Sequence, residues 1–254
     1  MEKTIASIDV GTTKVCTLIG EVGEEGELHI IGVGIVPSHG LHKGIVVDVK
    51  NATQAIATSV EKAERLSGYR IERAYVGVAG AHISAFNSKG VVATFRSKGG
   101  ITQEDINRAL DAAQAVPIPH NCEIIHVIPR NYIVDGQDGV RDPLGMYGLR
   151  LEAEVHVILG AVSFIHNLVK CVEANGIEVE ELVLAPLASA EAVLTEAERE
   201  MGVVLADIGG GTTDVAIFTE GSVLHTAVLP TGGNHLTTDV AVGLCAPFNV
   251  AEEI

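Results

Sequence analysis

The sequence has 254 residues, 47% of them apolar, and a formal net charge of −16. This length is sufficient for one large domain or two modest ones, each with a buried core. The negative charge argues against nucleic-acid binding, because phosphate backbones are bound by clustered Lys and Arg, and the sequence contains no basic run. The many Val, Ile and Ala residues are typical of an α/β protein whose strands are covered on both faces.

The cysteine and targeting patterns predict a cytoplasmic protein. The four cysteines lie far apart and form no CxxC pair, which favours reduced thiols over disulfides or a zinc site. The first residues show no signal-peptide pattern, and no apolar run is long enough to cross a bilayer.

The first 80 residues predict a sheet with one crossover helix. Three strands are expected within residues 4–36, followed by a helix that Asn51 caps and Gly68 ends. A short buried strand at residues 74–79 then returns to the sheet.

The pattern changes between Gly80 and Gly160. Polar–apolar alternation over residues 83–95 predicts extended chain, and Thr102 with Asp105 predicts a capping box at the start of a helix. Two further strands are expected at residues 123–132 and 149–159. We interpret this segment as a small α+β insertion, which on a binding core commonly serves specificity or assembly.

The chain then returns to the core. A helix is expected to end at Asn175-Gly176, followed by a strand at residues 180–185 and a helix over residues 188–199 that begins after Pro186. The apolar face predicted for the first of these helices consists of Phe164, Leu168, Val169 and Val172.

Two hairpins of similar sequence dominate the rest. Residues 203–218 read as strand, glycine-rich turn and strand, and residues 6–19 repeat the pattern with Lys14 where Asp214 stands. Glycines bring bare N–H groups close to an anion, threonine hydroxyls add donors, and aspartates can hold a hydrated divalent cation. Neither stretch is a Walker loop, since no Gly-Lys-Ser/Thr precedes a helix. One such hairpin alone is compatible with an ordinary β-turn.

The paired hairpins resemble the actin, Hsp70 and sugar-kinase superfamily, in which two such turns hold the phosphates of ATP. The resemblance implies an α/β actin-like (RNase H-like) nucleotide-binding fold. A strand at residues 222–229 is followed by Thr231-Gly232-Gly233-Asn234, which predicts a helix start whose N–H groups face an anion.

A further motif sharpens the resemblance. The stretch from Asp142 to Glu152, DPLGMYGLRLE, together with the two hairpins, is similar to the bacterial cell-division family FtsA over essentially the whole chain. The resemblance implies a first domain (1A) at residues 1–80, an inserted subdomain (1C) at residues 81–160, a return to the first domain at residues 161–200, and the start of a second domain (2A) at residues 201–254. A whole family member is expected to be longer, so the second domain is expected to be incomplete.

The resemblance also implies the site. ATP and Mg²⁺ are the expected ligands, with the metal held mostly through water by Asp9, Asp207 and Asp214. The residues expected at the phosphates are Gly11, Thr12, Thr13, Lys14, Gly209, Gly210, Gly211, Thr212, Thr213, Gly232 and Gly233.

One departure from the superfamily bears on catalysis. Ala185 stands before Pro186, where the Hsp70 branch has a glutamate, and alanine cannot orient or deprotonate water. We therefore expect nucleotide binding with slow or no hydrolysis. A small-molecule kinase of the sugar-kinase type is an alternative, although no convincing catalytic base is present, and a chaperone-like or pilus-assembly relative is another.

The expected partners follow from the family. The insertion at residues 81–160 is expected to mediate self-association and recruitment of later division proteins. Binding to the tubulin-like protein FtsZ, and attachment to the inner face of the membrane by a C-terminal helix, are expected to depend on segments that these 254 residues lack. No nucleic-acid partner is expected.

Overall fold

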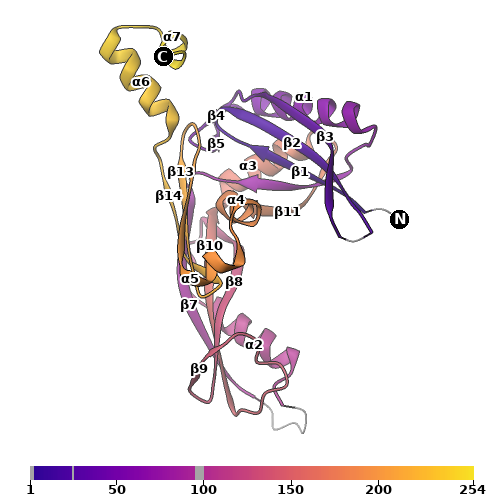
Figure 1. The fold of residues 1–254 in the computed structure, drawn as a ribbon, viewed down its shortest axis with the longest axis vertical. Coiled ribbons are helices and arrows are strands. Elements are labelled where there is room, and N and C mark those ends of the chain that lie inside the picture. The colour runs from indigo at the N-terminus through magenta and orange to yellow at the C-terminus, as the bar shows by residue number, and fades with distance from the viewer. Residues whose placement is uncertain (1–2, 25, 95–99) are drawn as a thin grey trace.

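A computed structural model describes residues 3–24, 26–94 and 100–254. The chain is elongated (Figure 1): a five-stranded sheet lies at one end, a second sheet extends away from it, and a third sheet runs beside the second. The three-strand region predicted within residues 4–36 and the extended stretch predicted over residues 83–95 each include residues outside the described ranges.

The five-stranded sheet has the order β11-β6-β1-β2-β3. Strands β1, β2 and β3 form an antiparallel meander, whereas β6 lies parallel to both β1 and β11. Both α1 and α3 contribute to the same apolar core as the sheet, which agrees with the predicted meander, crossover helix and returning strand. The elements are β1 (Lys3–Val10), β2 (Lys14–Val22), β3 (Leu28–Pro37), α1 (Val49–Ser67), β6 (Arg73–Val78), α3 (Val162–Glu173) and β11 (Glu178–Leu184).

The packing of α1 on the sheet depends on a close backbone approach. A Cβ built on Gly34 in β3 would lie 1.8 Å from the carbonyl oxygen of Ser59, so only glycine fits there. Ser59 is fully buried, and its hydroxyl donates to the Gly34 carbonyl at 2.7 Å and contacts the Thr17 hydroxyl at 2.7 Å. A buried polar pair is thus fully satisfied inside an apolar core.

Two predicted details of these helices are wrong. Asp48, not Asn51, caps α1, because the Asp48 side chain accepts from the Asn51 N–H at 3.1 Å and Asn51 already lies within the first turn. In α3 the predicted face omits Ile165 and Cys171, which are buried, and includes Phe164 and Val169, which are only half-buried. Val172 is buried and Leu168 packs against the core, as predicted. Gly68 ends α1 with a left-handed backbone, as predicted.

The second sheet, of order β7-β10-β8-β9, is built within the predicted insertion. The central strand β10 is buried along most of its length and pairs antiparallel with both neighbours. The short strand β9 was not predicted from the sequence. The elements are β7 (Ile83–Ala93), α2 (Gln103–Gln114), β8 (Cys122–Val134), β9 (Gln137–Val140) and β10 (Arg150–Ala161).

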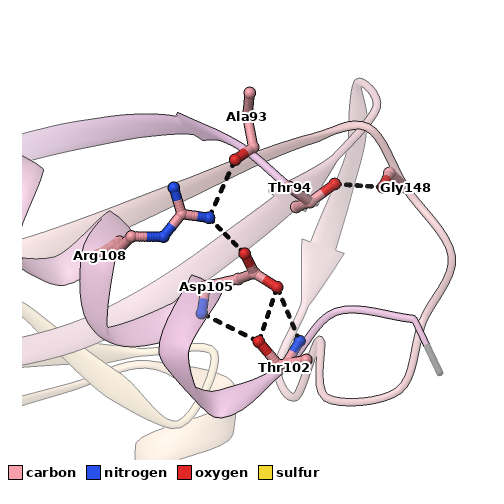
Figure 2. Close-up of polar contacts among 6 residues, drawn as sticks. All are labelled: Ala93, Thr94, Thr102, Asp105, Arg108 and Gly148. Carbon is pink, nitrogen blue, oxygen red and sulfur yellow. Dashed lines mark hydrogen bonds and ion pairs between the residues drawn. The ribbon is translucent and has the colours of Figure 1, made fainter. Parts of the chain in front are cut away.

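The predicted capping box at the start of α2 is confirmed (Figure 2). The Thr102 N–H and hydroxyl both donate to Asp105 Oδ2, and the Thr102 hydroxyl accepts from the Asp105 N–H. These hydrogen bonds, chiefly the one from the Thr102 backbone, lower the pKa of the buried Asp105. Arg108 pairs with Asp105 and donates to the Ala93 carbonyl, which ties α2 to β7.

The third sheet consists of β12 (Val203–Ile208), β13 (Thr213–Thr219) and β14 (Ser222–Leu229), all antiparallel, as predicted. Strand β14 contacts the second sheet, where Asn87 donates to the Leu224 carbonyl at 3.1 Å. Buried His156 of β10 contacts the Asn87 side chain at 2.6 Å and the Thr226 hydroxyl at 2.9 Å. The insertion therefore supports the sheet that carries the second hairpin.

The single helix predicted at residues 188–199 is wrong. The chain forms two helices, α4 (Ala185–Val193) and α5 (Glu196–Met201), because Thr195 and Glu198 form a second capping box. Pro186 lies in the first turn of α4, as predicted.

The last helices, α6 (Gly233–Leu244) and α7 (Phe248–Glu252), lie at the end of the molecule beyond the third sheet (Figure 1). Leu236, Val242 and Leu244 are at least 60% exposed. Over the described ranges, no helix combines the length and apolar character needed to cross a membrane.

Candidate functional site

The two glycine-containing turns have the same length. Val10 pairs with Val15 across the first hairpin and Ile208 with Thr213 across the second, so four residues form each loop. Each loop closes through one backbone hydrogen bond, from Gly11 to the Lys14 carbonyl at 3.0 Å in the first and from Gly209 to the Thr212 carbonyl at 2.9 Å in the second.

This register corrects the predicted alignment of the hairpins. Asp9 pairs with Cys16, and Asp207 pairs with Asp214. Cys16 therefore takes the place of Asp214, and Lys14 takes the place of Thr212. The sequence comparison misplaced Lys14 because it counted glycines rather than strand-to-strand spacing.

The turns face and contact each other. A Cβ built on Gly210 would lie 2.2 Å from Cγ2 of Thr13, and one built on Gly211 would lie 2.9 Å from the Thr12 hydroxyl oxygen. Two turns separated by about 200 residues thus meet through the predicted glycines and threonines. Glycine at both positions lets the threonines of the first turn approach the backbone of the second.

The three predicted aspartates influence one another. Asp214 is 4% exposed, and its pKa is raised to about 6, chiefly by burial and in addition by Asp207 and Asp9, although the hydrogen bond from Thr212 lowers it. Partial loss of hydration, then the Asp207 carboxylate, raise the pKa of Asp9, whereas Lys14 opposes the change. Mutual repulsion of this kind indicates a concentration of negative charge that a cation would relieve.

The donor set suits a hydrated cation. Asp214 Oδ2 accepts from the Thr212 hydroxyl at 3.1 Å, whereas its buried Oδ1 has no hydrogen-bond partner among the described residues. Across the part of the chain that the structure describes, no three His, Cys, Asp or Glu side chains converge on one metal position. Carboxylates arranged in this way fit Mg²⁺ held through its water ligands, because Mg²⁺ dehydrates reluctantly.

A cavity of about 370 Å³ opens beside Asp9 and Asp207. Ser189, one turn into α4, lines it and donates from its hydroxyl to Asp207 Oδ2 at 2.6 Å. Ala185 also lines this cavity, so the residue before Pro186 offers a methyl group there and no carboxylate. Ser189 could not be predicted as a site residue, since a serine four residues into a helix belongs to no recognisable motif.

The remaining predicted residues differ in their surroundings. Lys14, the last residue of the first turn, is exposed. Thr213 donates from its hydroxyl to the Thr231 carbonyl at 2.8 Å. Gly232 is buried against the second turn, where a Cβ would lie 2.4 Å from the Gly209 carbonyl oxygen. Gly233 and Asn234 donate their N–H groups to the Gly209 and Gly210 carbonyls, each at 2.9 Å.

The start of α6 therefore lies where it was predicted, but its N–H groups are engaged. Gly232 N–H donates to His235 Nδ1 at 3.1 Å, and the next two N–H groups bond to the second turn. The expectation that these groups face an anion is wrong for this arrangement of the chain. Their observed role is to fix the second turn against the helix.

Comparisons with known proteins bear on this site. The family model described as "SHS2 domain inserted in FTSA" matches residues 80–159, and the one described as "Cell division protein FtsA" matches residues 204–254. Cell division protein FtsA of Pseudomonas aeruginosa is 50% identical over 99% of the chain. The chain belongs to the FtsA family. FtsA of Neisseria meningitidis and of Bacillus subtilis are 43% and 42% identical, over 100% and 98% of the chain.

The chain spans 60%, 61% and 56% of the length of these three FtsA proteins. Among solved structures, a chain of the PilM-PilN type IV pilus biogenesis complex matches with a TM-score of 0.71 and 15% identity, over 98% of this chain and 68% of that one. The ethanolamine utilization protein EutJ from Carboxydothermus hydrogenoformans matches with a TM-score of 0.56 and 20% identity, over 99% of this chain and 60% of that one. The fold is the actin-like one expected from the sequence.

Proposed function

We propose that this FtsA-family chain binds ATP between the turns at residues 11–14 and 209–212 and acts in cell division as a nucleotide-gated assembly protein. The observation that carries the proposal is the contact between these two turns, which share one loop geometry and bring glycine and threonine donors together. Backbone N–H groups in tight turns form concave sites for anions. In an actin-like fold, such a pair of turns suits the phosphates of a nucleotide.

Mg²⁺ belongs to this proposal. Asp9, Asp207 and Asp214 would hold the ion through water, and the ion would neutralise the phosphate charge. The buried Oδ1 of Asp214, which has no hydrogen-bond partner among the residues that the structure describes, and the raised pKa values of Asp9 and Asp214 support a cation here. Ser189 orients the Asp207 carboxylate through its hydrogen bond.

We propose slow or no hydrolysis. The cavity beside Asp9 and Asp207 presents Ala185 at its edge, and an alanine cannot position water. Glu181 of β11 is not among the residues that line this cavity. It lies near His126 of the insertion, where burial lowers the pKa of the histidine and Glu181 opposes that change. Nucleotide would then act by favouring one domain arrangement over another.

The partners are proposed from the family. We propose that the insertion, residues 81–160, mediates self-association and recruits later division proteins, and that the whole protein tethers FtsZ to the cytoplasmic face of the membrane. Leu144, Tyr147 and Leu149 are each more than half exposed in the loop that identified the family, and such a surface suits a protein contact.

A titration tests the nucleotide proposal. Heat release on adding Mg-ATP is measured for the wild-type protein and for Asp207→Ala, and phosphate production is followed in the same samples. We expect saturable binding that the substitution weakens at least tenfold, about 1.4 kcal/mol, with little phosphate released. Undiminished binding by Asp207→Ala would contradict the proposed cation site, and rapid phosphate release would contradict the assembly function in favour of an enzyme.

A further inference from the structure

A second pocket lies at the junction of the two turns. It has a volume of about 260 Å³ and is bounded by both turns, by α6 and α7, and by the tight turn between β4 (Leu41–His42) and β5 (Ile45–Val46). The lining residues are Thr12, His42, Lys43, Gly211, Asn234, His235, Thr238 and Phe248. The sequence analysis assigned no role to the β4–β5 turn.

The β4–β5 turn is built into the first glycine-containing turn. Lys43 and Gly44 both have left-handed backbones, with φ of 51° and 74°, as in a two-residue hairpin loop. Gly44 donates its N–H to the Thr12 hydroxyl at 3.1 Å. The Cα of Lys43 would lie 3.0 Å from a Cβ built on Gly211, so Lys43 lies directly against the second turn as well.

The charge of this pocket is opposite to that of the cavity beside Asp9 and Asp207. The lining of the pocket contains one lysine, two histidines and no carboxylate, whereas the lining of that cavity contains Asp9 and Asp207 and no basic residue. His235 Nδ1 lies 3.1 Å from the Gly232 backbone nitrogen and 3.3 Å from the Gly232 carbonyl oxygen, so Gly232 holds this ring nitrogen and Nε2 is the one that can meet a ligand. Lys43, Asn234 and His235 thus give the pocket donors suited to an anion.

We propose that Lys43 is a phosphate-binding residue and that this basic pocket takes the phosphate end of the nucleotide, opposite the aspartates. The inference rests on the proposed nucleotide function and deepens it. A lysine ammonium is a compact charge with three donors, a common partner for phosphate. Lys43 meets both turns and comes from a third segment, so it adds to Lys14 a second cation placed to hold phosphate at their junction.

The test uses binding of inorganic tripolyphosphate and of Mg-ATP, measured by calorimetry. We expect Lys43→Gln to weaken tripolyphosphate binding about tenfold or more, because charge-assisted hydrogen bonds exceed neutral ones. Lys43→Arg should restore binding to within about threefold, since charge matters most. The matched control is Lys62→Gln, which removes a half-buried lysine of α1 whose ammonium donates to the Ile35 carbonyl.

The variants also separate a binding role from a structural one. Lys43→Gln keeps an L-residue at the left-handed position, so its thermal midpoint should match that of the wild type. Tripolyphosphate binding by Lys43→Gln equal to wild type, with Mg-ATP binding still lost in Asp207→Ala, would overturn this inference and leave the proposed function standing. Failure of the wild type to bind either ligand would overturn both.

Discussion

The two glycine-containing turns share one backbone geometry and carry opposite chemistry. The first turn holds Thr12, Thr13 and Lys14 and is followed by Cys16, whereas the second consists of three glycines and Thr212 and is followed by Asp214. The first turn therefore contributes hydroxyls and a cation. The second contributes bare backbone and a buried carboxylate.

The difference extends to what supports each turn. The first belongs to the large sheet, whose core α1 and α3 share, and the second belongs to a three-stranded sheet that rests on the insertion through His156 and Thr226. The two hairpins thus share one loop structure and carry different side chains. The anionic phosphates and the cationic metal of one ligand can then be bound from two sides of the junction between the turns.

The contact between the turns should be the most sensitive point. In Gly210→Val, the new side chain meets Thr13 at a distance that no real Cβ adopts, so the turns must separate. We expect Mg-ATP affinity to fall about a hundredfold, some 2.7 kcal/mol. Gly243→Ala in α6 is the control, because a Cβ there meets nothing within 4 Å. Equal affinities measured by calorimetry would show that the turns do not act together.

The acidic side of the comparison is tested by Asp214→Asn. The raised folded-state pKa of Asp214, about 6 against 3.8, means that ionisation destabilises the fold as the pH rises through this range. Asparagine should therefore stabilise the chain by roughly 1–3 kcal/mol above pH 6, and this advantage should fade toward pH 4. The same change should weaken Mg-ATP about tenfold. Denaturant melts at several pH values measure the first effect; a variant less stable than wild type at pH 7 would contradict it.

The support of the second turn is tested through His156. Burial is the main cause that lowers the pKa of His156 to about 4, so the native state stays neutral while the unfolded chain takes a proton near pH 6.5. This site's contribution to stability is complete above pH 6.5, and we expect it to fall by up to about 3 kcal/mol as the pH falls toward 4.

The His156→Gln variant separates this effect from that of Asp214. The two residues change the stability in opposite directions between pH 4 and 6, and the variant removes only the contribution of His156. In denaturant melts the stability of the variant relative to wild type should rise by up to about 3 kcal/mol as the pH falls from 6.5 to 4, because the variant lacks the His156 contribution and keeps that of Asp214. A wild-type pH profile that His156→Gln leaves unchanged would show that His156 does not hold the two sheets together.

The smallest effect is expected at Ser189. Asp207 Oδ2 accepts a hydrogen bond from the Ser189 hydroxyl at 2.6 Å. Ser189→Ala should weaken Mg-ATP by about threefold to tenfold, since one hydrogen bond contributes about 1 kcal/mol. Ser163→Ala, an exposed serine in α3, is the control. A Ser189→Ala affinity indistinguishable from that control would remove Ser189 from the site.

Much of this arrangement could be predicted where local chemistry decides the structure. The capping box at Thr102, the left-handed stop at Gly68 and both hairpins follow from residue types at fixed spacing. The break between α4 and α5 was not predicted, although Thr195 and Glu198 have the spacing of a capping box. The prediction of one helix rested on apolar periodicity, which continues across the break.

The other misses depend on tertiary contacts. Nothing local shows that Lys43 meets both turns, since its neighbours come from residues 12 and 211. The alignment of Lys14 with Thr212 required the strand register, which the count of glycines conceals. The use of the α6 N–H groups by the second turn likewise appears only when the helix is placed against it.

The most direct test of the account is a crystal structure of the protein with Mg-ATP bound. We predict phosphate oxygens within hydrogen-bond distance of the N–H groups of residues 12–13 and 210–211, because the N–H groups of Gly11 and Gly209 already close the loops. We place the metal on the side of Asp9, Asp207 and Asp214 and Lys43 on the other. Nucleotide bound elsewhere, for instance in the cavity of about 310 Å³ beside Ile128 and Leu187, would contradict the central claim that the paired turns form the phosphate site.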